Sequence, residues 1–180
     1  MKRKQSISWI VRTAIFIALL IVLQVATVPL GNIIVTGSIV NLLLIVSVMA
    51  CGLSSGLTVA VISPIMAKFL GIGPLWSLIS FIAAGNVVLV LLWHLIGNRN
   101  MAHRYTAYIA ALLCAATAKC LVLYIGIVRI AVPVFLGLPE AQAAAISGMF
   151  SIPLLITALI GGGFAIALFP RLRTAIRKGA

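Results

Sequence analysis

Lys119 is the residue whose chemistry stands out first, because it is a cation inside the apolar run of residues 105–128. A charge at the centre of a bilayer costs about 3 kcal/mol on insertion scales. The one acidic side chain of the sequence, Glu140, falls in a segment that we expect outside the membrane. Lys119 is therefore neutral, or faces a water-filled cavity, or is completed by an anionic ligand. We favour a substrate-binding lysine over one that merely tolerates its site.

Two amides and two further cations are candidates for contact with the same ligand. Asn41 and Asn86 lie inside apolar runs, where an amide serves either as a hydrogen bond between helices or as a ligand contact. Lys68 and Arg129 lie near the outer ends of their helices, where a long cation can reach the interface unaided, and we favour that reading. If they join Lys119, the outer half of a cavity becomes electropositive, which suits a carboxylate or phosphate.

Two aromatic residues, Trp76 and Tyr124, complete the set of candidate substrate contacts. Both are expected near the outer ends of helices. Such positions are more typical of the aromatic belt at a membrane interface than of a stacking platform for a ligand.

Residue patterns typical of catalysis are missing from the sequence. It contains no phosphate-binding loop, no acidic pair and no cluster of metal ligands, and its two histidines lie at or near the expected cytoplasmic boundary. Three cysteines lie in apolar stretches without paired spacing, so we interpret them as packing residues. We expect no catalytic residue, no metal and no cofactor, and a chain that is not an enzyme and does not hydrolyse ATP.

Composition indicates the elements that must position these residues. The chain of 180 residues is 64% hydrophobic and 8% charged, with a mean hydropathy of +1.31. A soluble domain needs far more surface charge, so we predict an all-α integral membrane protein that forms a single transmembrane domain over residues 1–180. Its six transmembrane helices are predicted at about 8–28, 33–51, 57–70, 75–96, 105–128 and 146–169, and Pro64 leaves the continuity of the third open.

The positions of the basic residues predict how the chain crosses the membrane. The net charge is +12, and the cations gather in residues 2–12, in residues 99–104 and in residues 171–178. Six crossings bring all three groups to one side, which the positive-inside rule identifies as cytoplasmic, so both termini are expected there. Because the basic residues flank apolar runs without interleaved aromatic residues, we expect contact with anionic lipid and not with nucleic acid.

Small residues at helical spacing mark two possible packing faces. Ala14 and Ala18 are four residues apart in the first run, and Gly161–Gly163 lie within the last. Such residues allow another helix to approach closely. From spacing alone, ordinary packing within the chain is the preferred interpretation of both.

Taken together, several stretches give the chain a resemblance to a known family. They are Ala14-x-x-x-Ala18, Gly37-Ser38-Ile39-Val40-Asn41, Ser63-Pro64 through Gly71, Gly85-Asn86, Lys119 to Tyr124, and Met149-Phe150-Ser151 through Gly161-Gly162. With its size and six helices, the chain resembles the S components, which are the substrate-binding membrane subunits of energy-coupling factor (ECF) transporters. The resemblance covers nearly the whole chain.

This resemblance implies a function in the prokaryotic plasma membrane. Such a subunit captures a vitamin or similar micronutrient from outside and docks on a transmembrane coupling subunit, which two cytoplasmic ATPases drive. Ala14 and Ala18 look like the family's docking motif. Lys119, Asn86 and Arg129 fall near the expected substrate site, and no vitamin is singled out.

Two other functions remain open at this point. A self-sufficient secondary transporter or channel would be consistent with the apolar helices, although such proteins often show internal repeats or intramembrane acids, and we see neither. An assembly subunit of a larger membrane complex would instead pair Lys119 with a carboxylate of a partner.

Overall fold

The structure is a computed structural model that describes the backbone of residues 2–73, 75–97 and 104–178, with side chains over 9–73, 75–97 and 105–169. The described chain is helical and contains no strand. Its elements are α1 (Lys2–Thr27), η1 (Val28–Leu30), α2 (Ile33–Cys51), α3 (Leu53–Phe69), α4 (Trp76–Gly97), α5 (Arg104–Leu123), η2 (Tyr124–Leu136), α6 (Glu140–Met149) and α7 (Ile152–Lys178).

Five of the described helical segments are long and apolar enough to cross a membrane. They are Trp9–Leu30, Ile33–Cys51, Trp76–Gly97, Tyr105–Leu136 and Glu140–Phe169. The apolar helix α3 is shorter, because its 17 residues span only about 25 Å at 1.5 Å per residue. The described chain is therefore all-helical, and its five to six apolar helices are compatible with a multi-pass membrane protein.

Helix boundaries differ from those expected in several regions. The first helix begins at Lys2, and the helix expected over 146–169 is divided between α6 and α7, which continues to Lys178. A single glycine, Gly52 with φ +89°, makes the turn between α2 and α3, so α3 begins at Leu53 and not at residue 57. The fifth helix does not end at residue 128 but continues as η2, a π-helix that accommodates Pro133. Most of the mixed segment 129–145 is thus helical, with a break at Gly137, whose φ is +51°.

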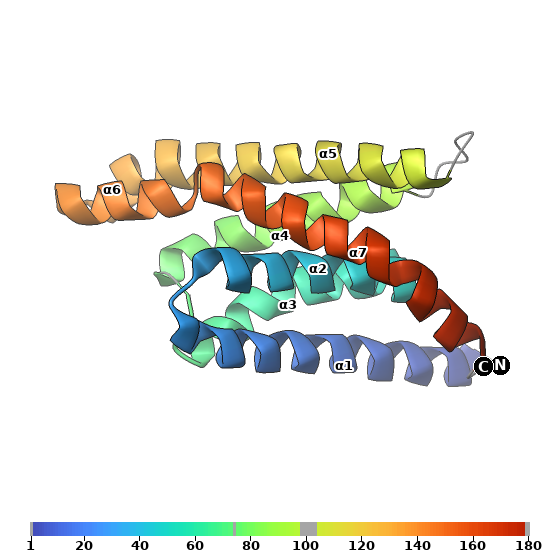
Figure 1. Ribbon diagram of the computed structural model, residues 1–180. Coiled ribbons are helices and arrows are strands. Elements are labelled where there is room, and N and C mark those ends of the chain that lie inside the picture. Colours follow the sequence, from blue (N-terminus) through green and yellow to red (C-terminus); the bar gives the residue numbers. More distant parts are fainter. Residues whose placement is uncertain (1, 74, 98–103, 179–180) are drawn as a thin grey trace.

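The helix α2 occupies the centre of the bundle. It packs against α1, α3, α4 and, most extensively, α7, while α5 packs on α4 and α7. Figure 1 shows α1 and α5 on opposite sides of the molecule, with α2 and α4 between them. A helix surrounded by other helices has side chains buried on most faces, and α2 accordingly contains a run of buried residues from Leu43 to Val48. It is this helix that carries Asn41.

The beginning of α1, the end of α4, the beginning of α5 and the end of α7 lie at one end of the bundle (Figure 1). The basic groups predicted to be cytoplasmic belong to these segments, except Arg99, which lies outside the described residues. At the opposite end, η2 and α6 extend beyond the other helices (Figure 1).

Candidate functional site

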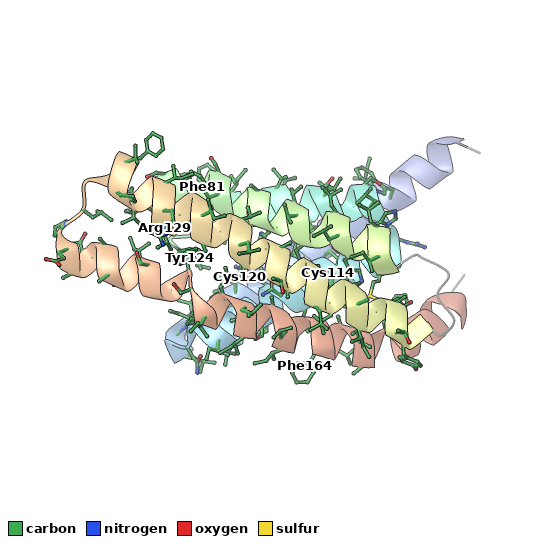
Figure 2. All side chains as sticks on the ribbon, turned by 90° about the horizontal axis from the view of Figure 1, so that it is seen from above. Phe81, Cys114, Cys120, Tyr124, Arg129 and Phe164 are labelled. Atoms are coloured by element: carbon green, nitrogen blue, oxygen red, sulfur yellow. The ribbon has the colours of Figure 1, made fainter. Side chains whose placement is uncertain are left out.

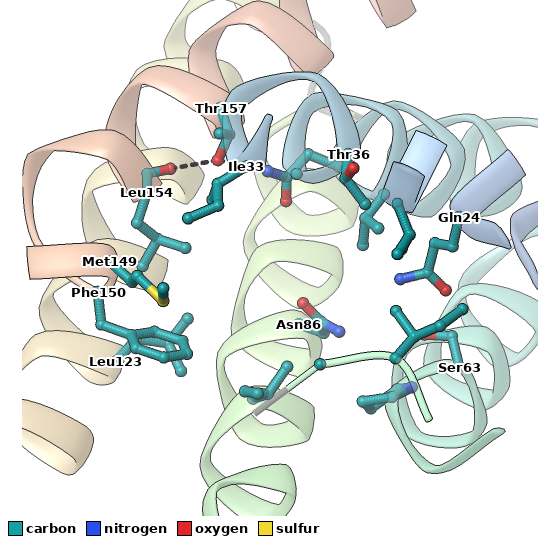
Figure 3. Close-up of a pocket in the computed structure, with 18 of the residues that line it drawn as sticks. Gln24, Ile33, Thr36, Ser63, Asn86, Leu123, Met149, Phe150, Leu154 and Thr157 are labelled. Atoms are coloured by element: carbon teal, nitrogen blue, oxygen red, sulfur yellow. Dashed lines mark hydrogen bonds between the residues drawn. The ribbon is translucent and has the colours of Figure 1, made fainter. Parts of the chain in front are cut away.

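A cavity of about 490 Å³ opens in the half of the bundle away from the chain ends. Residues of several helices line it: Gln24 near the end of α1, Thr36 early in α2, Asn86 in α4, Leu123 at the end of α5 and Leu154 early in α7 (Figure 3). Its volume lies in the range of small-molecule sites.

Lys119 lies at this cavity and is almost completely buried, with 4% of its surface exposed. Its Nζ atom donates hydrogen bonds to Asn41 Oδ1 at 2.6 Å and to Asn86 Oδ1 at 2.8 Å. Three helices, α2, α4 and α5, therefore meet at one ammonium group. An ammonium has three N–H donors, and the two amides use two of them.

The two amides are themselves held in place. Asn41 Nδ2 donates to Thr157 Oγ1 at 3.3 Å, and this hydroxyl donates to Leu154 O in its own helix at 2.8 Å. Because the Asn41 amide nitrogen is engaged by an acceptor, its amide oxygen points to the lysine. The network thus links α7 to α2 and α5.

Pro64 explains the orientation of the Asn86 side chain. Proline has no N–H, so the carbonyl four residues earlier, that of Ala60, loses its helical partner. Asn86 Nδ2 donates to Ala60 O at 3.4 Å. The proline that seemed to threaten the continuity of α3 leaves that helix unbroken and supplies an acceptor that orients Asn86 toward Lys119.

Lys119 is the only ionisable residue that lines the cavity among the residues described. Its polar partners are neutral amides, and Glu140 is exposed at the start of α6. A buried charge without a counter-ion is costly, although polar contacts lower the cost. An anion bound beside Lys119 would therefore stabilise the charged form of the lysine.

The rest of the cavity wall is mostly apolar. Leu123, Met149, Phe150 and Leu154 gather on one side (Figure 3). Gln24 and Ser63 lie on the opposite side, and the Gln24 Oε1 atom is buried without a hydrogen-bond partner among the described residues.

Four of the predicted contact residues do not line the cavity: Lys68, Trp76, Tyr124 and Arg129. The Arg129 guanidinium lies over the Tyr124 ring, 5.8 Å from its centroid, and Figure 2 shows the two side chains together on η2. The Trp76 ring meets Phe69 edge to face at 5.2 Å. Lys68 and Arg129 therefore do not join Lys119 at the cavity, and the alternative in which the three cations make its outer half electropositive does not apply there.

Ala14 and Ala18 are both exposed on α1. The neighbouring Thr13 is buried instead and forms a hydrogen bond of 2.6 Å with Ser55 of α3. From spacing alone, packing within the chain was the preferred interpretation of Ala14 and Ala18. In the structure both side chains are exposed, so the described chain does not bury them.

Sequence reasoning missed Gln24 and Thr157 as cavity residues. Gln24 had a signal, because it is an amide near the outer end of an apolar run. Thr157 had almost none, since threonine in a membrane helix commonly bonds its own backbone, as it also does here.

A family model described as "ECF transporter, substrate-specific component" matches residues 9–173. Neither the comparison with curated proteins nor that with solved structures found a match.

Proposed function

Because this chain belongs to the family of substrate-specific components of ECF transporters, we propose that it captures a small anionic molecule in the cavity at Lys119. Members of this family are transport subunits and not enzymes. The ligand enters from the outer side of the membrane, and the half of the bundle that contains the chain ends faces the cytoplasm. The positive-inside pattern of the basic residues supports this orientation.

One observation carries the proposal. Lys119 is a buried cation at a cavity, its two hydrogen-bond partners are neutral amides, and the cavity-lining residues of the described chain include no carboxylate. An anionic ligand would accept the remaining N–H of the ammonium and neutralise its charge. Asn41 and Asn86 position the lysine. We leave Lys68, Trp76, Tyr124 and Arg129 out of the proposed site.

Delivery to the cytoplasm requires partners. We propose that α1 docks on the transmembrane coupling subunit through its exposed Ala14 and Ala18, and that two cytoplasmic ATPases drive release. The exposure of both alanines on an otherwise apolar helix face supports docking, since small residues allow close approach of a partner helix.

The first test is mass spectrometry of small molecules retained by the detergent-purified protein. We expect one anionic compound in the wild type, lost from Lys119→Ala and from the milder Lys119→Gln. Arg12→Gln is the matched control, because Arg12 is a cation of the membrane helix α1 that does not line the cavity. It should retain the compound.

Two outcomes would reject this function. Equal retention by Lys119→Ala and wild type would remove the lysine from the site. Uptake into liposomes by this chain alone, driven by an ion gradient, would identify a secondary transporter instead.

A further inference from the structure

We propose that the ligand is a monocarboxylate with an apolar body and a neutral hydrogen-bonding group away from the carboxylate. This inference rests on the proposed capture function and narrows its substrate class. Three properties of the cavity carry it: one cationic side chain, one apolar wall and one unpaired amide oxygen.

The charge of the site favours a single negative charge on the ligand. Lys119 supplies one positive charge, and no other lining residue of the described cavity is ionisable. A phosphate monoester carries about −1.5 to −2 charges at neutral pH, so it would leave negative charge buried without a partner. A carboxylate matches the lysine and can accept its remaining N–H.

The apolar wall determines the body of the ligand. Leu123 follows Lys119 by one helical turn, so a molecule bound to the ammonium through its carboxylate lies directly beside this leucine. Met149, Phe150 and Leu154 continue the wall (Figure 3). A strongly polar body, such as a sugar, would lose its hydration there without gaining partners.

The unpaired side-chain oxygen of Gln24 is the basis for the neutral hydrogen-bonding group of the ligand. Gln24 lines the cavity on the side opposite Met149 and Phe150 (Figure 3), and its Oε1 atom is buried without a partner in the described chain. Buried amides normally have hydrogen bonds, and an unmatched one needs an explanation. A neutral group of the ligand with an N–H or O–H donor, such as a secondary amide, would donate to Gln24 Oε1 without adding charge.

Four matched probes test each property on the full-length protein in detergent. They are 6-acetamidohexanoate, its uncharged primary amide, 6-acetamidohexyl phosphate, and octanoate, which lacks the acetamido group. Affinity is obtained from the dependence of the melting temperature on probe concentration. We expect 6-acetamidohexanoate to bind most tightly, with the primary amide and the phosphate each weaker by at least about tenfold.

Two variants connect the probes to the residues. Lys119→Gln should weaken 6-acetamidohexanoate by about 100-fold, while Arg12→Gln leaves it unchanged. Gln24→Leu should weaken 6-acetamidohexanoate by about 3- to 10-fold and leave octanoate unaffected. Gln142→Leu on the exposed surface of α6 is the control for Gln24.

The outcomes separate this inference from the function on which it rests. Tighter binding of the phosphate, or equal binding of the uncharged amide, would overturn the ligand class and leave the capture function intact. If Gln24→Leu weakened octanoate binding as much as 6-acetamidohexanoate binding, Gln24 would not contact a neutral group of the ligand. If no probe raises the melting temperature at millimolar concentration, the monocarboxylate class is rejected. If molecules retained from cells are also absent, the capture function fails with it.

Discussion

At the scale of single residues, the site depends on a cation surrounded by neutral acceptors. Lys119 is bonded to two amide oxygens that belong to helices remote in sequence, and neither brings a negative charge. This arrangement holds the ammonium in place without neutralising it. The lysine therefore remains available to pair with an anionic ligand, which a buried ion pair within the chain would prevent.

Asn86→Asp tests this logic by supplying a counter-ion of nearly the same shape. The new carboxylate would form a charge-assisted hydrogen bond with Lys119 in exchange for the weaker donation to Ala60 O, so we expect a folded protein whose affinity for an anionic ligand falls by at least about tenfold. Binding is measured by ligand retention and by thermal stabilisation. Asn86→Leu, which removes the amide without adding charge, separates loss of the hydrogen bond from competition by charge.

If Asn86→Asp bound the anion as well as the wild type does, Lys119 would not be neutralised by the ligand. The lysine would then be only a structural link between α2, α4 and α5.

At the scale of elements, the close approach of α7 to α2 holds the network together. A Cβ atom on Gly161 would collide with the Ser38 carbonyl oxygen and lie 2.9 Å from Asn41 Cβ. The backbone at Gly161 therefore packs directly against the turn of α2 that presents Asn41. Small residues at such contacts are typical of packing between membrane helices.

Gly161→Ala should force α7 away from α2. We expect destabilisation of about 1–3 kcal/mol, as for overpacked sites, together with weaker ligand retention because Asn41 shifts. Thermal unfolding in detergent and retention measure the two effects. Gly163→Ala is the matched control, since its Cβ atom meets nothing within 4 Å.

Equal melting temperatures for the two alanine variants would contradict this account of the α2–α7 contact. The glycines would then serve another purpose in the last helix, such as a bend.

At the scale of the whole molecule, the proposed docking surface and the cavity are separate parts of α1. Ala14 and Ala18 are exposed, while Gln24, further along the same helix, lines the cavity. Assembly and ligand binding should therefore be separable by mutation.

Ala14→Trp and Ala18→Trp are expected to block assembly with the coupling subunit, and hence uptake, because a bulky ring prevents close helix contact. Ligand retention by the isolated subunit should stay within about twofold of wild type, since neither residue lines the cavity. Co-purification with the coupling module and uptake by cells measure the outcome. The control is Thr117→Trp, which places the same ring at an exposed small residue of α5, on the other side of the bundle (Figure 1).

Normal assembly of both α1 variants would assign docking to another face. Loss of assembly in Thr117→Trp as well would indicate a general effect of added bulk.

The class of protein follows from the sequence alone. Apolar runs without alternating polarity leave only helices in lipid, because every backbone group must be paired there and barrel strands would alternate polar and apolar residues. The family resemblance is confirmed by the match over residues 9–173. The sequence also indicated that Lys119 is unusual. A cation far inside a membrane helix without a nearby acidic residue is costly, whichever face of the helix carries it.

Which residues surround that lysine depends on how the helices pack. The runs are apolar on all sides, so periodicity does not reveal which face of each helix points inward. Packing rotates α2 and α4 to bring Asn41, 78 residues away, and Asn86, 33 residues away, onto Lys119. The same packing leaves Lys68, Trp76, Tyr124 and Arg129 outside the cavity and turns Gln24 toward it.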